Sequence, residues 1–144
     1  MQLRAIERPC HRVATIIRWV PAFLRAFGRE AEMEHVIASE LKIALMDPSS
    51  VVLEWVDADD MVRGAALGSA ILDAQGIPSL ELRWIEASNV APEVSRETML
   101  TQAAGMGWRR VYFHTPHSDR AIRARFPTAE PVSTLWRLET PWAT

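Results

Sequence analysis

The stretch that decides the fold is residues 51–86, VVLEWVDADDMVRGAALGSAILDAQGIPSLELRWIE. Residues 51–56 are β-branched and aromatic, a second extended run covers 61–72, and apolar and charged side chains alternate over 80–86. The polar turn DADD separates the first two runs, and the glycine- and proline-containing turn DAQGIP separates the last two. The pattern predicts three consecutive antiparallel strands.

The segments before this meander predict one short strand and two helices. Residues 2–7 alternate weakly and predict an N-terminal strand. Apolar residues over 13–27 recur at helical spacing, with Pro21 expected to kink or divide the helix. A second apolar stripe over 33–45 predicts another helix, which ends at Asp47-Pro48.

The segments after the meander alternate between helix and strand. Ser88 or Asn89 could cap a third helix, and Thr115-Pro116 or Ser118 a fourth. We expect, in order, a helix from 92 to about 106, a strand over 110–115, a short helix ended by Pro127 and a last strand over 132–138. The complete order is β-α-α-β-β-β-α-β-α-β, which predicts a single α/β domain over residues 1–144 with a mixed sheet.

Composition limits the classes of function. The 144 residues are 49% apolar and 24% charged, as in globular domains, and the net charge of −2 gives no general attraction to nucleic acid or to an anionic membrane. Cys10 is the single cysteine, which excludes an internal disulfide and a cysteine-based metal cluster. We expect an intracellular protein, because no apolar stretch resembles a secretory signal or reaches the roughly 20 residues of a membrane span.

This order of elements resembles that of the GCN5-related N-acetyltransferase superfamily over nearly the whole chain, from Met1 to Glu139. The resemblance implies an acetyl-CoA site between the fourth strand (80–86) and the fifth (110–115). In that family the cofactor pyrophosphate rests on a glycine-rich loop that opens the third helix, where backbone N–H groups and the helix dipole attract anions.

The loop that should hold the phosphates departs from the family pattern. Residues 87–98 contain no glycine and lack the family's Arg/Gln-x-x-Gly-x-Gly/Ala motif. Pro92 removes a backbone donor, and Glu93 and Glu97 would repel phosphate, for which Arg96 compensates only in part. The resemblance is therefore to a degenerate member of the family.

A second family signature is also altered. It places an Asn, then an Ala three residues on, then a Tyr seven residues on at the fourth helix, where the tyrosine often protonates the leaving thiolate. The nearest match here has Ser118 for the Asn, keeps Ala121, and has Arg125 for the Tyr. Tyr112, the single tyrosine, falls in the preceding predicted strand, where a packing role is expected.

The candidate site residues follow from these positions. The carboxylates available as a general base on or beside the fourth strand are Glu81 and Glu86, although alternation favours solvent-facing roles for both. By position, the candidates for cofactor binding are Ile85, Arg96, Glu97 and Thr98. The candidates for partner binding are Arg120, Arg123, Arg125 and Trp142. His114, His117 and Asp119 do not have the spacing of a metal site, and no metal is expected.

Two functions remain open, with a third beside them. The missing motifs favour a catalytically degenerate protein that binds a protein partner or its own copies and uses no cofactor. It would be similar to the small acetyltransferase-like internal virion proteins of tailed bacteriophages. The alternative is an acyl-CoA-dependent N-acetyltransferase with a non-standard cofactor loop. The arginines between Arg109 and Arg125 would allow a nucleic-acid contact, which the net charge disfavours.

Overall fold

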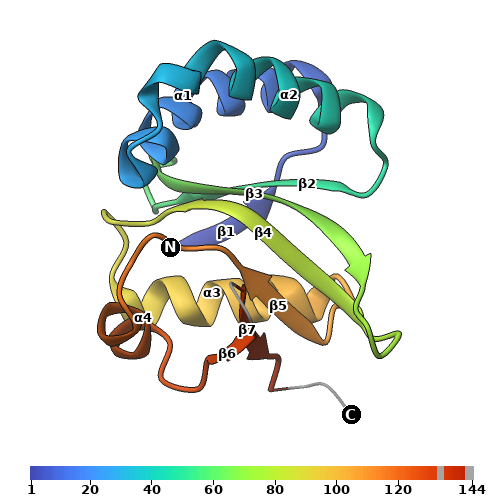
Figure 1. The fold of residues 1–144 in the computed structure, drawn as a ribbon, viewed down its shortest axis with the longest axis vertical. Coiled ribbons are helices and arrows are strands. Elements are labelled where there is room, and N and C mark those ends of the chain that lie inside the picture. The colour runs from blue at the N-terminus through green and yellow to red at the C-terminus, as the bar shows by residue number, and fades with distance from the viewer. Residues whose placement is uncertain (133–134, 142–144) are drawn as a thin grey trace.

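In the computed structural model, which describes residues 1–132 and 135–141, a seven-stranded sheet lies between two layers of helices (Figure 1). The strand order is β1-β2-β3-β4-β5-β7-β6; β4 and β5 pair in parallel and all other neighbours are antiparallel. The strands are β1 (Gln2–Ala5), β2 (Ser50–Val56), β3 (Val62–Leu72), β4 (Pro78–Glu86), β5 (Arg110–Phe113), β6 (Glu130–Val132) and β7 (Leu135–Glu139). The helices are α1 (Pro9–Phe27), α2 (Met33–Met46), α3 (Pro92–Gly105) and α4 (Asp119–Arg125), with a 3-10 turn at Glu30–Glu32. The predicted α/β class and mixed sheet are confirmed.

The helices divide between the two faces of the sheet. Helices α1 and α2 cover one face, and α3 and α4 cover the other (Figure 1). The first pair packs on Val52, Leu67 and Trp84, whereas the second pair packs on a larger core that includes Trp55 and Phe113. Each face of the central strands is therefore buried, as expected for a sheet between two helical layers.

The segments flanking the meander differ from the expectations at two points. Of the two outcomes expected at Pro21, a kink or a division, the division does not occur: α1 runs through Pro21 as one helix, and Val20 and Phe23 on either side of it are buried in the core between α1 and the sheet. The strand expected over 132–138 is instead two strands, β6 and β7, paired with Val132 opposite Leu135. The sequence between them has no Gly, Asn or Pro to mark a turn.

The predicted caps have mixed outcomes. Ser118 caps α4, since its Oγ accepts the N–H of Ala121 at 3.3 Å. The cap predicted for α3 is wrong: that helix begins after Ala91, which makes no side-chain cap hydrogen bond. Ser88 instead donates its N–H to the Glu86 carboxylate at 2.9 Å, so the preceding loop has its own local structure.

One irregularity in the meander positions the end of β4. Leu67 of β3 pairs with Trp84, but the next residue, Gly68, pairs with Leu82, so Arg83 is an extra residue and forms a β-bulge. The strands are so close here that a Cβ on Gly68 would lie 2.1 Å from the carbonyl oxygen of Glu81. The bulge therefore requires glycine at position 68.

The bulge turns two consecutive side chains toward the same helical layer. Arg83 Nη2 donates to Glu40 of α2 at 2.8 Å, and Trp84 Nε1 donates to the same carboxylate at 3.1 Å. Beyond this point no strand in the described part of the chain pairs with β4 on its β5 side, because the β4–β5 pairing ends at Leu82 and Phe113. The two parallel strands consequently separate at their carboxyl ends.

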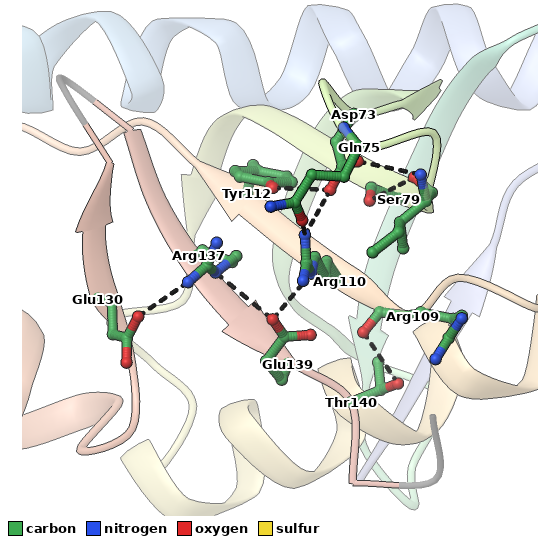
Figure 2. Close-up of polar contacts among 11 residues, drawn as sticks. Asp73, Gln75, Ser79, Arg109, Arg110, Tyr112, Glu130, Arg137, Glu139 and Thr140 are labelled. Carbon is green, nitrogen blue, oxygen red and sulfur yellow. Dashed lines mark hydrogen bonds and ion pairs between the residues drawn. The ribbon is translucent and has the colours of Figure 1, made fainter. Parts of the chain in front are cut away.

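The other end of the β4–β5 pair is fastened by Asp73 in the turn between β3 and β4 (Figure 2). Its Oδ1 accepts the N–H groups of Gln75 at 2.9 Å and Ile77 at 3.0 Å. Its Oδ2 accepts from Arg110 and from the Tyr112 hydroxyl, both at 2.9 Å. These donors, the Ile77 N–H first among them, hold the pKa of Asp73 well below its usual value.

Figure 2 also shows how the network continues to β6 and β7. Arg110 Nε pairs with Glu139 at 2.8 Å, and Arg137 contacts Glu139 at 3.4 Å and Glu130 at 2.9 Å. These ion pairs connect β5 to the two strands that follow α4. The sheet is thus rigid at the amino end of β5 and open at its carboxyl end.

We predict that Gly68→Ala destabilises the protein by about 1–3 kcal/mol, because the new methyl group must displace backbone at the bulge. The matched control is Gly105→Ala, where no atom lies within 4 Å of the new Cβ. That change should be neutral or stabilise by up to about 1 kcal/mol, since alanine favours helix. Urea unfolding measures both, and equal losses would contradict the role given to Gly68.

We predict that Asp73→Asn lowers Tm at pH 7 and that the difference from wild type narrows as the pH falls. The carboxylate has a lowered pKa in the folded state, so its stabilisation is complete above the unfolded value of about 3.9 and is lost below it. Circular dichroism melts between pH 7 and pH 2.5 measure the effect. A pH-independent difference would contradict it, and the exposed Asp59→Asn is the control, which should leave Tm at pH 7 unchanged.

Candidate functional site

A cavity of about 320 Å³ opens where β4 and β5 separate. Its base is formed by the buried aromatic rings of Trp55 and Phe113. Ile85 and Glu86 at the end of β4 form one wall, and the segment that follows β5, residues 114–117, forms another. The cavity is therefore a direct consequence of the bulge that ends the β4–β5 pairing.

The cavity reaches both helical layers. On one side it is bounded by Ala26 and Phe27 at the end of α1. On the other side Met99 of α3 and Phe126 of α4 line it, and both are buried in the core of that layer. A ligand could therefore lie through the sheet, with its two ends on opposite faces.

Arg125 is the principal cation of the cavity wall. It comes from the last turn of α4 and reaches across to α3, where its Nη1 donates to the carbonyl of Ala87 at 3.2 Å and to Ser95 Oγ at 3.0 Å. Burial lowers the pKa of Arg125, and the carboxylates of Glu86 and Glu93 act in the opposite direction. Neither carboxylate forms an ion pair with it, so among the described residues its hydrogen-bond partners are neutral oxygens.

A second arginine fixes the position of the first. Arg96 of α3 donates its Nη1 to the carbonyl oxygen of Arg125 at 3.1 Å. This contact joins the start of α3 to the end of α4. Arg96, a candidate for cofactor binding, thus holds the element that carries the cavity's guanidinium.

Glu86, a candidate general base, lines the cavity but is engaged locally. Its Oε1 accepts the N–H of Ser88 at 2.9 Å and also the hydroxyl of that residue. Both donors belong to the loop that precedes α3. The carboxylate therefore stabilises this glycine-free loop, which reduces its availability as a base.

Glu81, the other candidate base, does not line the cavity, but its partner does. Its Oε1 lies 3.5 Å from Nε2 of His114, the first residue after β5. His114 lines the cavity, and its backbone N–H donates to the carbonyl of Leu82 at 3.1 Å, which fixes its position at the point of separation. Glu81 thus contacts a residue of the cavity wall without lining the cavity itself.

The other predicted cofactor residues take different positions. Ile85 lines the cavity. Thr98 faces the sheet, where its Oγ1 accepts the indole N–H of Trp55 at 2.8 Å and donates to the Val94 carbonyl at 2.6 Å. Glu97 is exposed on α3 and does not line the cavity.

The predicted partner-binding residues separate in space. Arg120 and Arg123 are exposed on α4, whereas Arg125 on the same helix lines the cavity. Trp142 lies outside the described residues. No three metal-ligating side chains come together among the residues that the structure describes, and none of the helices in that part of the chain is long and apolar enough to cross a membrane.

Sequence reasoning left Arg125 and His114 out of the candidate catalytic and cofactor groups. A signal for Arg125 was present, because it occupies the tyrosine position of the altered second signature, which places it on the cavity side of α4. The signal for His114 was its position at the end of the fifth predicted strand. Its contact with Glu81 depends on strand register, which the sequence does not give.

Comparison with known proteins identifies the fold. No family model and no curated protein matches the chain. Among solved structures, an acetyltransferase from Thermus thermophilus is similar with a TM-score of 0.65 and 14% identity, covering 96% of this chain and 97% of that one. A chimera of spermidine N-acetyltransferase SpeG from Vibrio cholerae and hSSAT has a TM-score of 0.63 and 12% identity, covering 97% and 96%.

Tetrahymena GCN5 is similar to the same degree, with a TM-score of 0.61 and 11% identity over 97% of this chain and 96% of its own. The chain therefore has the fold of the GCN5-related N-acetyltransferases, as the order of its elements predicted. At these identities the likeness concerns the fold alone.

We predict that Thr98 has a structural role. Thr98→Val leaves the Trp55 indole N–H without its acceptor and should destabilise the protein by about 1–3 kcal/mol in urea unfolding. Thr101→Val, on the exposed side of the same helix, is the control and should change stability by less than about 0.5 kcal/mol. Unchanged stability in Thr98→Val together with weaker coenzyme A binding would instead make Thr98 a ligand contact.

Proposed function

We propose that this chain binds an acyl-coenzyme A thioester in the cavity between β4 and β5 and transfers the acyl group to an amine. The observation that carries the proposal is Arg125, a partly buried cation without an ion-pair partner among the described residues, in the wall of a cavity at the separation of two parallel strands. Such a cation favours an anionic ligand, because bound phosphate would supply the charge that its neutral partners do not.

The residues present fit the phosphates of coenzyme A in a way that differs from the family motif. A guanidinium offers several N–H donors in a planar fork and can take the place of the backbone donors of a glycine-rich loop. Arg125 lies against Ala87 and Ser95, at the beginning of α3, where the helix dipole adds to its charge. Glu93 opposes this attraction from the exposed side of the first turn.

The rest of the cavity suits the remainder of the donor and the reaction. Acyl-coenzyme A supplies an activated thioester carbonyl when it is bound. The apolar walls formed by Met99, Phe113 and Phe126 exclude water from it, which limits hydrolysis. His114 stands at the opposite side of the cavity from Arg125's helical layer and is available to an acceptor amine, whereas Glu86 beside it is engaged by Ser88.

The competing function is the non-catalytic module favoured by the altered motifs, which would bind a protein partner or its own copies and, as a virion-associated protein, act inside a host cell. Its partner surface would include Arg120 and Arg123 of α4. The similar solved structures are acetyltransferases and support the enzymatic proposal over this one. Ligand binding distinguishes the two.

We predict that coenzyme A and acetyl-CoA bind with micromolar affinity in isothermal titration and raise Tm, because a ligand of the native state alone stabilises it. Arg125→Gln should weaken coenzyme A binding about 10- to 100-fold, the loss expected for a charged hydrogen bond. S-acetylpantetheine, which has no phosphate, should bind both proteins equally.

The control variant is Arg120→Gln, which removes an exposed cation from the same helix and should leave both affinities unchanged. The melting temperature of each unliganded variant shows whether it is folded. If the wild type binds neither coenzyme A nor acetyl-CoA at millimolar concentration, the acyltransferase proposal is wrong. Light scattering after size exclusion would then test assembly of the non-catalytic module.

A further inference from the structure

We infer that His114 accepts the proton of the acceptor amine and that Glu81 is its positioning residue. The inference rests on the proposed function and names the residues that the acceptor meets. Neither motif of the sequence assigns this role; by position the sequence offered the carboxylates Glu81 and Glu86 as candidates for it, although alternation favoured solvent-facing roles for both. Three features of the structure favour His114 instead: the face of the sheet on which it lies, its exposure to solvent, and the hydrogen bonds that occupy Glu86.

His114 and Glu81 lie on the same face of the sheet. In β5, Val111 and Phe113 point into the core of α3 and α4, so the alternation of the strand directs His114 to the other face. In β4, Leu80 and Leu82 also belong to that core, so Glu81 points to the same face as His114. The pair is thus on the α1 and α2 side, away from the layer that carries Arg125.

The side chains of His114 and Glu81 are accessible from solvent. The His114 side chain is 37% exposed and that of Glu81 is 32% exposed, so an acceptor can reach the pair from solvent. His114 is in the cavity wall, whereas Glu81 is behind it. A donor held by Arg125 on one face and an amine approaching on the other would meet at the gap between the strands.

Glu86 is less suited than His114 to accept a proton. That carboxylate accepts two hydrogen bonds from Ser88 and holds the loop before α3. Protonation of Glu86 would weaken both bonds, so proton transfer to it would disturb the loop. The His114 side chain does not hold that loop. The Glu81 carboxylate, 3.5 Å from His114 Nε2, stabilises the positive charge that the imidazole gains on protonation.

The proton transfer is balanced within these groups. The N–H bond of the acceptor ammonium breaks, its electron pair stays on the amine nitrogen, and the proton forms a new N–H bond at Nδ1 of His114. The positive charge passes from the amine to the imidazole, whose Nε2 faces Glu81. Water removes the proton from the imidazolium afterwards, so no further reactant is required.

The test combines kinetics with covalent labelling. Acetyl-CoA turnover is measured with n-butylamine or water as the acceptor. His114→Asn should lower kcat by about 10²- to 10⁴-fold, leave KM for acetyl-CoA within about 2-fold, and remove the acid limb of the pH profile. Glu81→Gln should lower kcat about 10-fold with the same KM, and Glu81→Asp should recover part of it. His35→Asn, exposed on α2, is the control.

Labelling gives a readout that does not depend on turnover. Bromoacetyl-CoA should alkylate the His114 imidazole with loss of bromide, and mass spectrometry of peptides should place the adduct at that residue. Coenzyme A should suppress the adduct, and His114→Asn should lack it. This result requires the imidazole to lie beside the reactive end of the bound donor.

The outcomes separate the inference from the proposed function. Failure of the wild type to bind coenzyme A overturns both. If coenzyme A binds, a coenzyme A-suppressible adduct at another residue in place of His114, full activity in His114→Asn, or no turnover with either acceptor overturns the assignment of His114 and leaves coenzyme A binding standing. Alkylation of the exposed Cys10 that coenzyme A does not suppress is ordinary thiol reactivity and is not such an adduct. An adduct at His114 together with loss of kcat and of the acid limb supports it.

Discussion

The extra residue in β4 is the constraint on which the site depends. Arg83 has no opposite residue in the register of β3, and Gly68 lets the backbone of β4 approach close enough to accommodate the extra residue. The strand then leaves the path of β5, so four residues of β4 continue beyond the last parallel pair. Without that separation β4 and β5 would stay hydrogen-bonded to their ends, and their paired backbones would cover Trp55 and Phe113, the aromatic base of the cavity.

The same irregularity makes the two faces unequal, and this inequality suits the proposed acyl transfer. Before the bulge, alternate residues of β4 enter the α3 and α4 core; at the bulge, Arg83 and Trp84 both contact Glu40 on α2. The network around Asp73 holds the far end of β5 while the carboxyl end stays open. Because β4 and β5 are held together at the amino end of β5 and separate at their carboxyl ends, a cavity can cross the sheet while the rest of the sheet stays packed.

Periodicity made the elements predictable, whereas contacts across the sheet were not. The helical stripes of α1 and α2 and the alternation of β4 depend on neighbours in sequence, so their positions followed from the chain alone. The bulge depends on Gly68 meeting Glu81, and the His114 contact depends on the register of β4 with β5. The strand pair β6 and β7 was missed because the sequence between Val132 and Leu135 contains no Gly, Asn or Pro to mark a break.

The altered motifs lead to a different conclusion once the positions are known. The glycine-free loop before α3 and the arginine in place of the family tyrosine look like two independent losses in the sequence. In space they meet, because Arg125 donates to Ala87 and Ser95 at the loop itself. Phosphate binding requires positive potential and N–H donors, which a guanidinium supplies as well as a chain of backbone amides does. The second change therefore places a cation where the first removed donors, which supports the proposal of a cofactor site built from a side chain.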